Sequence, residues 1–199
     1  PISNPHECIH GSPAEFQIAL TQINACRDRS PNAHDWKEIE LWLLTWQARD
    51  IIPIKYSSGW ESWMVVAWLA VQESWRHTLL AYLYMSVCGT TSGDEKVRSS
   101  VRQILQILET VRKQQALDTE VNVPCFLQYL MAGICSQNEK HRAIVRKKLG
   151  DICGTRLWLM RGTDFVPVLD HLWHGAAADG RPITWGDYLS REIALPVIV

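Results

Sequence analysis

The chain has 199 residues, and its 20 basic and 21 acidic side chains leave a formal net charge of −1 at pH 7. This length is enough for one large domain with a substantial apolar core. The balanced charge argues against a nucleic-acid-binding surface, because such surfaces normally form a basic stripe. The unusual feature is the count of ten tryptophans, a residue that fills cores, interfaces and ligand pockets.

The six cysteines are scattered along the chain and form no CxxC pair. Their spacing matches no zinc site, so we expect no metal or other cofactor in this segment. The absence of a signal peptide favours a reducing, intracellular compartment. The chain begins with Pro1 instead of methionine and ends in an apolar run, which indicates a segment of a longer protein.

Two helices are predicted before residue 50. The sequence Ser-Pro-Ala-Glu at residues 12–15 is typical of a helix start, with a capping serine, a proline at the first helical position and a glutamate three residues after the cap. This helix extends to about Cys26, and a second helix begins near Asp35. The apolar face of the second helix consists of Trp36, Ile39, Trp42, Leu43 and Trp46.

Residues 60–88 carry the longest apolar pattern in the chain. Their apolar side chains recur at helical spacings of three and four, and the first half is apolar on its other faces as well. Glu61, Glu73 and Arg76 interrupt the pattern, so no uncharged run reaches the roughly 18 residues of a membrane span. The pattern therefore predicts a long, buried, Trp-rich central helix and no membrane association.

Five further helices are predicted after residue 94. The short turn at 89–94 favours an antiparallel hairpin with the central helix. Gly133 interrupts an apolar helix, which indicates a close helix crossing. The basic residues of 140–148 alternate with apolar ones, so we expect them to form a solvated face. The total of about eight helices without a strand predicts an all-α, irregular, single domain over 1–199.

Four stretches resemble a known family in their order along the chain. They are the Leu-x-x-Trp end of the second helix, WRHTLLAYLYMSV in the central helix, VPCFLQYLMAGICSQNEKHRAIVRKKL, and DFVPVLDHLWHGAAADG. Together they span most of residues 14–195. The pattern is similar to the regulatory (middle homology) domain of fungal-specific zinc-cluster transcription factors, the second fungal transcription-factor domain family.

The resemblance implies a nuclear, non-catalytic regulatory domain that senses a signal, a small apolar ligand or a partner protein and controls transcription. Members of this family usually carry a six-cysteine, two-zinc DNA-binding cluster, and no residues here match it. Zinc and direct nucleic-acid contact are therefore expected only outside this segment. The expected partners are an apolar small-molecule effector, a second copy of the chain, or a transcriptional co-regulator.

Tryptophans of the second and central helices are candidates to line an apolar ligand pocket, since such pockets combine apolar walls with few polar groups. Ordinary core packing is the alternative explanation for these residues. Arg76 lies three residues after Glu73, so the two can pair on one helix, although an anionic ligand is an alternative partner. If Arg76 is buried, a carboxylate or helix-end carbonyls must satisfy it. The candidate pocket residues are Trp42, Trp46, Trp63, Trp68, Trp75 and Arg76.

The sequence contains no convincing catalytic or metal-binding pattern. His171 and His174 are spaced for one helical face, but neither HExxH nor a nearby cysteine pair supports a metal site there. The chain lacks a GxSxG elbow, a phosphate loop and a DDxxD-like carboxylate cluster of the kind a terpene cyclase uses. An α-helical enzyme is thus the disfavoured class. The alternative to a regulatory domain is a helical dimerisation or interaction scaffold without DNA binding.

Overall fold

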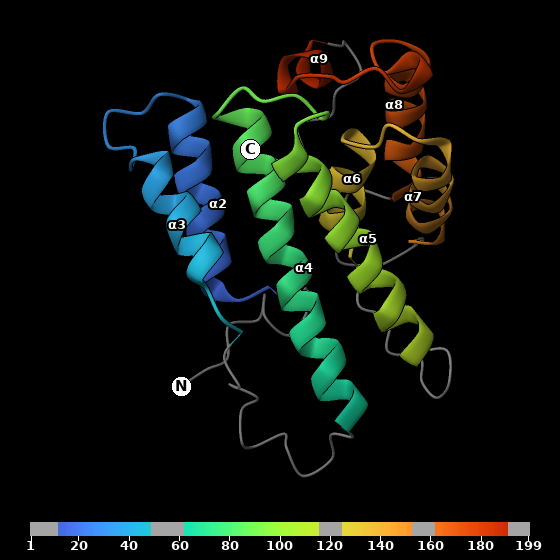
Figure 1. Cartoon of the computed structure of the whole chain (residues 1–199), viewed down its shortest axis with the longest axis horizontal. Helices are drawn as coiled ribbons and strands as arrows, with labels where there is room; N and C mark the ends of the chain where they lie inside the picture. Colours follow the sequence, from blue (N-terminus) through green and yellow to red (C-terminus); the bar gives the residue numbers. More distant parts are fainter. Residues whose placement is uncertain (1–11, 49–61, 116–124, 153–161, 191–199) are drawn as a thin grey trace.

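A computed structural model describes residues 12–48, 62–115, 125–152 and 162–190 (Figure 1). Within these ranges the chain forms eight α-helices and one short 3-10 helix, with no β-strand, which confirms the all-α class. The helices are α2 (Ala14–Arg27), α3 (Trp36–Thr45), α4 (Ser62–Ser86), α5 (Glu95–Gln115), α6 (Phe126–Ile134), α7 (Glu139–Asp151), α8 (Gly162–His174), η2 (Ala178–Gly180) and α9 (Trp185–Leu189).

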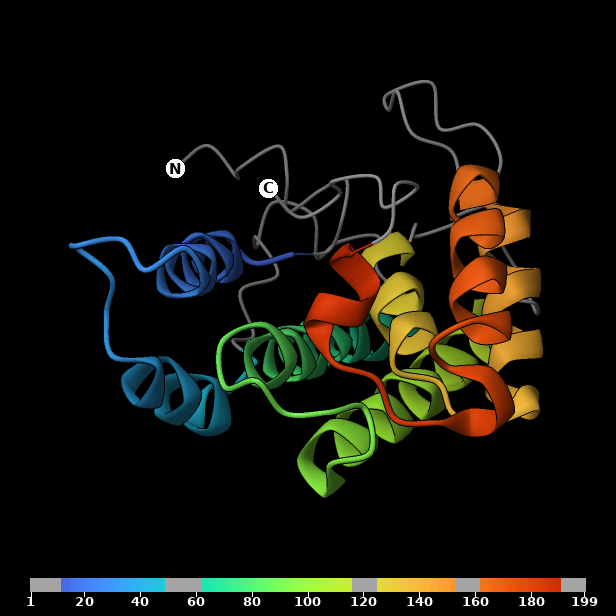
Figure 2. The same cartoon turned by 90° about the horizontal axis from the view of Figure 1, so that it is seen from above.

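Helix α4 is the element against which the other layers pack. It contacts α2 and α3 on one side, and α5, α6 and α9 elsewhere along its length. Figure 2 shows α2 and α3 on one side of α4, with α6, α7 and α8 on the other. The predicted hairpin is present, because α5 returns along α4 after a short turn.

The fully buried part of α4 is its second half, where every side chain from Thr78 to Met85 is buried. The first half was expected to be buried on all faces, but Val66 is 50% exposed and Trp68 is only half-buried. The difference arises because neighbouring helices converge on the second half. Tyr82 contacts Arg27 of α2 and Trp185 of α9 there.

Helices α2 and α3 pair through aromatic side chains and begin in different ways. Asp35 accepts a hydrogen bond from the Lys37 backbone N–H (3.0 Å) and caps α3, as expected near this residue. Ser12 does not cap the backbone of α2. Its hydroxyl instead accepts a hydrogen bond from Gln17 Nε2 (2.8 Å), and Pro13 occupies the N-cap position.

Helices α6, α7 and α8 form a second packed group, in which each helix contacts the other two. Asn138 caps α7 by accepting a hydrogen bond from the His141 backbone N–H (2.8 Å). Thr184 and Asp187 form a reciprocal capping box at the start of α9. Side chains of both α7 and α8 pack closely against Gly133 of α6, because an added Cβ atom would meet Leu169 Cδ1 at 2.7 Å and Val145 Cγ1 at 2.9 Å. The expected close helix crossing at Gly133 is therefore confirmed.

The crossing predicts opposite effects for two glycine substitutions. Replacing a helical glycine with alanine normally stabilises by about 0.5–1 kcal/mol. In Gly133→Ala, overpacking against the fully buried Leu169 and Val145 costs about 1–3 kcal/mol and outweighs that gain. We expect a lower free energy of unfolding by urea denaturation.

Gly150→Ala is the matched control, since nothing lies within 4 Å of its added Cβ atom. This variant should be more stable than the wild type. Equal stabilisation by both substitutions would contradict the close crossing at Gly133.

Candidate functional site

Arg76 links the central helix α4 to the end of α3. Its Nε donates to Glu73 Oε1 (3.0 Å) and Oε2 (2.9 Å), and its Nη2 also contacts Oε1. Its Nη1 donates to the Leu43 carbonyl oxygen (3.3 Å). Leu43 lies in the last turn of α3, where carbonyls lack helical partners and a cation is favoured by the helix dipole. Both kinds of partner expected for a buried Arg76, a carboxylate and a helix-end carbonyl, are thus present.

The carboxylate of Glu73 contacts two side chains of α4, Arg76 and His77. His77 Nε2 lies 3.4 Å from Glu73 Oε1, on the next turn of the same helix. Burial alone would raise the pKa of Glu73, but the hydrogen bonds from His77 and Arg76 and the Arg76 charge outweigh it and lower the pKa to about 2. Glu73 therefore stays ionised across the physiological pH range.

Two of the candidate tryptophans, Trp42 and Trp46, pack against α2. The Phe16 ring lies 5.9 Å from the Trp42 ring and 4.5 Å from the Trp46 ring, measured between centroids. Trp46 Nε1 donates to the carboxylate of Glu15 (3.1 Å). These contacts hold α2 and α3 together directly beside the junction made by Arg76.

The other candidates are distributed along α4. Trp75 is buried in the core at 5% exposure, Trp68 is half-buried, and the side chain of Trp63 lies outside the described residues. The structure thus brings Trp42, Trp46 and Arg76 to the α2–α3–α4 region, while Trp75 has the burial of a core residue. The ligand pocket itself stays a prediction.

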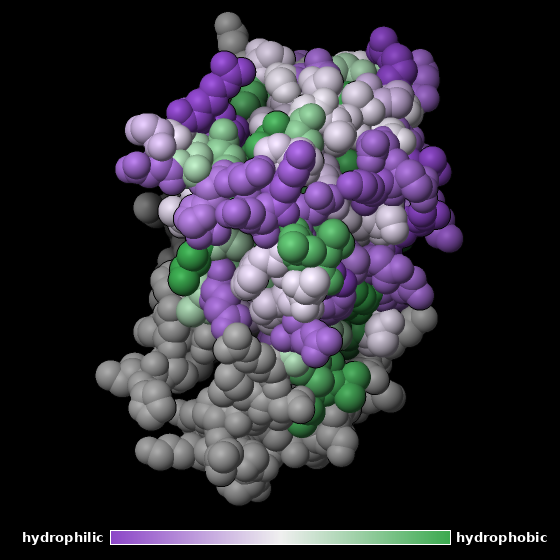
Figure 3. All heavy atoms as spheres, turned by 60° about the vertical axis from the view of Figure 1, so that its left-hand side comes forward, coloured by the Kyte–Doolittle hydropathy of each residue, from purple (hydrophilic) through white to green (hydrophobic). Residues whose placement is uncertain are grey.

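The outer face of α2 and α3 carries exposed apolar side chains. Figure 3 brings this side of the molecule forward and shows apolar patches among hydrophilic side chains. These residues are Ile18 (60% exposed), Leu41 (63%), Trp42 (37%) and Leu44 (53%).

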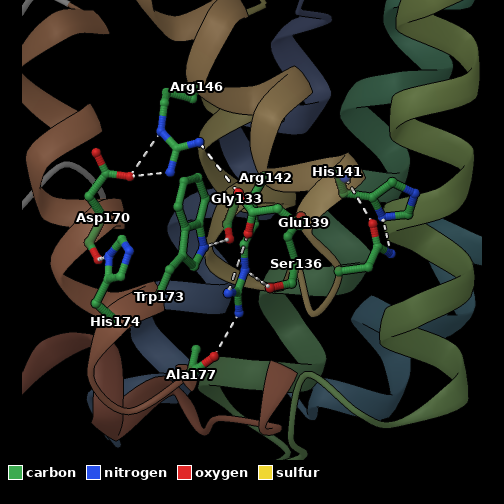
Figure 4. Close-up of polar contacts among 11 residues, drawn as sticks. Gly133, Ser136, Glu139, His141, Arg142, Arg146, Asp170, Trp173, His174 and Ala177 are labelled. Carbon is green, nitrogen blue, oxygen red and sulfur yellow. Dashed lines mark hydrogen bonds and ion pairs between the residues drawn. The ribbon is translucent and has the colours of Figure 1, made fainter. Parts of the chain in front are cut away.

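A second polar cluster, around Arg142 on α7, was not predicted from the sequence. Arg142 is 6% exposed. Its Nη2 donates to the Ala177 carbonyl (2.7 Å) and its Nε to the Ser136 carbonyl (3.2 Å), as Figure 4 shows. Its guanidinium carbon also lies 5.7 Å from the centre of the Trp173 ring. Arg142 therefore joins the end of α6, α7 and the segment after α8.

Arg146 and Trp173 complete this cluster. Arg146 donates twice to Asp170 Oδ1, from Nη2 (2.7 Å) and Nε (3.0 Å), and its guanidinium carbon lies 5.1 Å from the Trp173 ring centre. Trp173 Nε1 donates to the Gly133 carbonyl (3.0 Å). All of these hydrogen bonds go to protein acceptors, so the cluster joins α6, α7 and α8.

The expectation that residues 140–148 form a solvated face is wrong for Arg142. Arg142 precedes the buried residues Val145 and Leu149 by three and seven positions, so helical spacing alone places it on the inner face. The long-range acceptor at Ala177 satisfies its charge there, and that partner cannot be found from local spacing. The neighbouring Lys140 and Lys147 are exposed, as expected.

Comparison with known protein families shows which family the chain belongs to. The sequence profile of the fungal specific transcription factor domain matches residues 18–197. The chain belongs to this family. No curated protein and no solved structure matches it significantly.

Membership of the fungal transcription factor domain family confirms the resemblance and supports a role in transcription regulation. Proteins with this domain are in general nuclear, and the family is not one of enzymes. Within the described ranges, no cluster of three or more His, Cys, Asp or Glu side chains has a metal-site arrangement. None of the described helices combines the length and hydropathy of a membrane span.

The stretches that resemble the family contribute the two polar junctions of this fungal transcription factor domain. WRHTLLAYLYMSV contains Arg76, and the stretch beginning at Val123 contains Gly133 and Arg142. DFVPVLDHLWHGAAADG contains Asp170 and Trp173. The stretches that resemble the family therefore contain the side chains that join the helices of this chain to one another.

The low pKa of Glu73 predicts a pH-dependent contribution to stability. The folded-state pKa of about 2 lies below the ordinary value of 4.5, so the stabilisation is complete above pH 4.5 and is lost as the pH falls towards 2. Because the side chain is 35% exposed, we expect only about 1–2 kcal/mol. Urea denaturation should give Glu73→Gln a lower free energy of unfolding than the wild type. This difference should shrink as the pH falls from 4.5 towards 2. A difference that is constant from pH 7 to pH 2 would contradict the pairing.

Proposed function

We propose that this chain is a non-catalytic regulatory domain that receives a signal as a bound apolar molecule and transmits it to transcription through the position of α2 and α3 on α4. The observation that carries the proposal is the junction at Arg76, where the end of α3 meets the central helix beside aromatic side chains. The family match supports the regulatory role.

The contacts between α2–α3 and α4 include several discrete polar bonds. Tyr82 donates to Asn24 Oδ1 (2.7 Å) and accepts from Arg27 Nη1 (2.8 Å). Tyr84 donates to Glu40 Oε1 (2.8 Å). These bonds hold one register of α2–α3 on α4, and a molecule inserted beside Arg76 would first break the bond to the Leu43 carbonyl.

The chemistry of the region favours an apolar ligand with one polar group. Trp46 and Trp68 are half-buried and offer large apolar surfaces. Arg76 offers a charged donor on the same helix as Trp68. A ligand shifts the α2–α3 pair only if it binds one arrangement more tightly than the other. If the polar group of the ligand takes the place of the Leu43 carbonyl on Arg76, the ligand binds more tightly to the arrangement in which that bond is broken.

Tryptophan fluorescence tests this proposal. Titration with sterols and neutral aromatic metabolites should change the emission of the wild-type chain and raise its melting temperature. Trp46→Phe should weaken the best ligand about fivefold or more through lost contact area. The control Trp36→Phe, on the same helix but outside the candidate set, should leave the affinity unchanged.

A second candidate function is an interaction scaffold that dimerises or binds a co-regulator through the exposed apolar side chains of Ile18, Leu41 and Leu44. Sedimentation in the same ligand series separates the two functions. A chain that dimerises and shows no fluorescence or melting response to any ligand would contradict ligand sensing and support the scaffold.

A further inference from the structure

The C-terminal end of α4 meets α9 through a cluster of three aromatic residues. The Tyr82 ring of α4 lies 5.1 Å from the Trp185 ring of α9 in an edge-to-face arrangement, and Trp185 lies 5.1 Å from Tyr188. Exposure of the three side chains is 1%, 6% and 4%. Figures 1 and 2 place this junction at the end of α4 where the chain turns into α5.

Two polar atoms in this aromatic cluster are buried and have no hydrogen-bond partner in the part of the chain that the structure describes. They are Trp185 Nε1 and the Tyr188 hydroxyl. The third hydroxyl, of Tyr82, makes two hydrogen bonds with α2. Buried polar groups in native proteins are nearly always paired, because an unpaired donor has lost water without gaining a partner. Two such groups on one turn of one short helix therefore require an explanation.

Loose attachment of α9 does not explain them. The preceding residue Ile183 is paired with Ser92 in both directions, since Ser92 N–H donates to the Ile183 carbonyl (2.8 Å) and Ile183 N–H donates to Ser92 Oγ (3.0 Å). The capping box of Thr184 and Asp187 fixes the start of the helix. The hydroxyl of Thr90, two residues before Ser92, is also buried and has no hydrogen-bond partner within the described ranges.

The chemistry of these groups restricts what can pair with them. Indole N–H only donates, and a tyrosine O–H donates readily, so the missing partner carries an acceptor. Burial raises the pKa of Tyr188 to about 12, which reflects surroundings that disfavour charge. The neighbouring aromatic faces favour a flat aromatic frame.

We propose that the junction of α4 and α9 is a binding site for a small neutral aromatic molecule whose acceptor oxygen receives hydrogen bonds from Trp185 and Tyr188. Both residues are buried, so binding displaces the five-residue helix α9 slightly from α4. The site is separate from the region around Arg76 and does not depend on ligand binding there.

The first test asks whether the Tyr188 hydroxyl has a partner in the free protein. Tyr188→Phe removes an unpaired group and should raise the melting temperature of the full chain by about 2 °C or leave it unchanged. Tyr84→Phe is the control, because its buried hydroxyl is paired with Glu40, and it should lower the melting temperature by several degrees. A loss in Tyr188→Phe equal to that in Tyr84→Phe would show that an ordered water already occupies the place of the ligand, and would overturn the proposal.

The second test uses two probes that differ by one carbonyl oxygen, 2-acetylnaphthalene and 2-ethylnaphthalene. Calorimetric titration of the wild type should give affinity for the acetyl compound at least about threefold tighter than for the ethyl compound. The preference should disappear in Tyr188→Phe and in Trp185→Phe. Equal affinities for the wild type, or no binding of either probe, would overturn the proposal.

Discussion

The structure depends on one constraint, which is that α4 is enclosed by other helices along its second half and still carries polar side chains. Arg76, Tyr82 and Tyr84 each project from this helix and bond to acceptors or donors on α2 and α3. A buried polar group without a partner is costly, so these side chains restrict where α2 and α3 can lie. Apolar packing draws the helices together, and the polar bonds select one arrangement among several of similar apolar area.

A buried polar side chain with partners on neighbouring segments is also found in the group formed by α6, α7 and α8. Arg142 is the buried charge there, and the Ser136 and Ala177 carbonyls are its fixed partners. The crossing at Gly133 allows Trp173 to reach the Gly133 carbonyl. The aromatic junction of α4 with α9 is different, because two of its polar atoms have no hydrogen-bond partner among the described residues. This contrast is the reason to assign a ligand to that junction and a structural role to Arg142.

Much of this fold could be predicted from the sequence, since local rules determine where helices begin and which faces are apolar. The caps at Asp35, Asn138 and Thr184 and the close crossing at Gly133 follow from residue type and spacing. The hydrogen bonding of the buried Arg142 could not be predicted from the sequence, because its partner at Ala177 is 35 residues away in the sequence. The Arg76–Glu73 pair was predictable from its spacing, whereas the bond to Leu43 requires knowing which helix lies opposite.

The central claim is that the polar bonds of α4 hold α2 and α3 in place, and amide hydrogen exchange of Arg76→Met tests it most directly. The substitution keeps most of the side-chain volume and removes the bond to the Leu43 carbonyl. The account predicts faster exchange throughout α2 and α3 with unchanged exchange in α6, α7 and α8. Unchanged exchange in α2 and α3, or uniformly faster exchange in all helices, would contradict it.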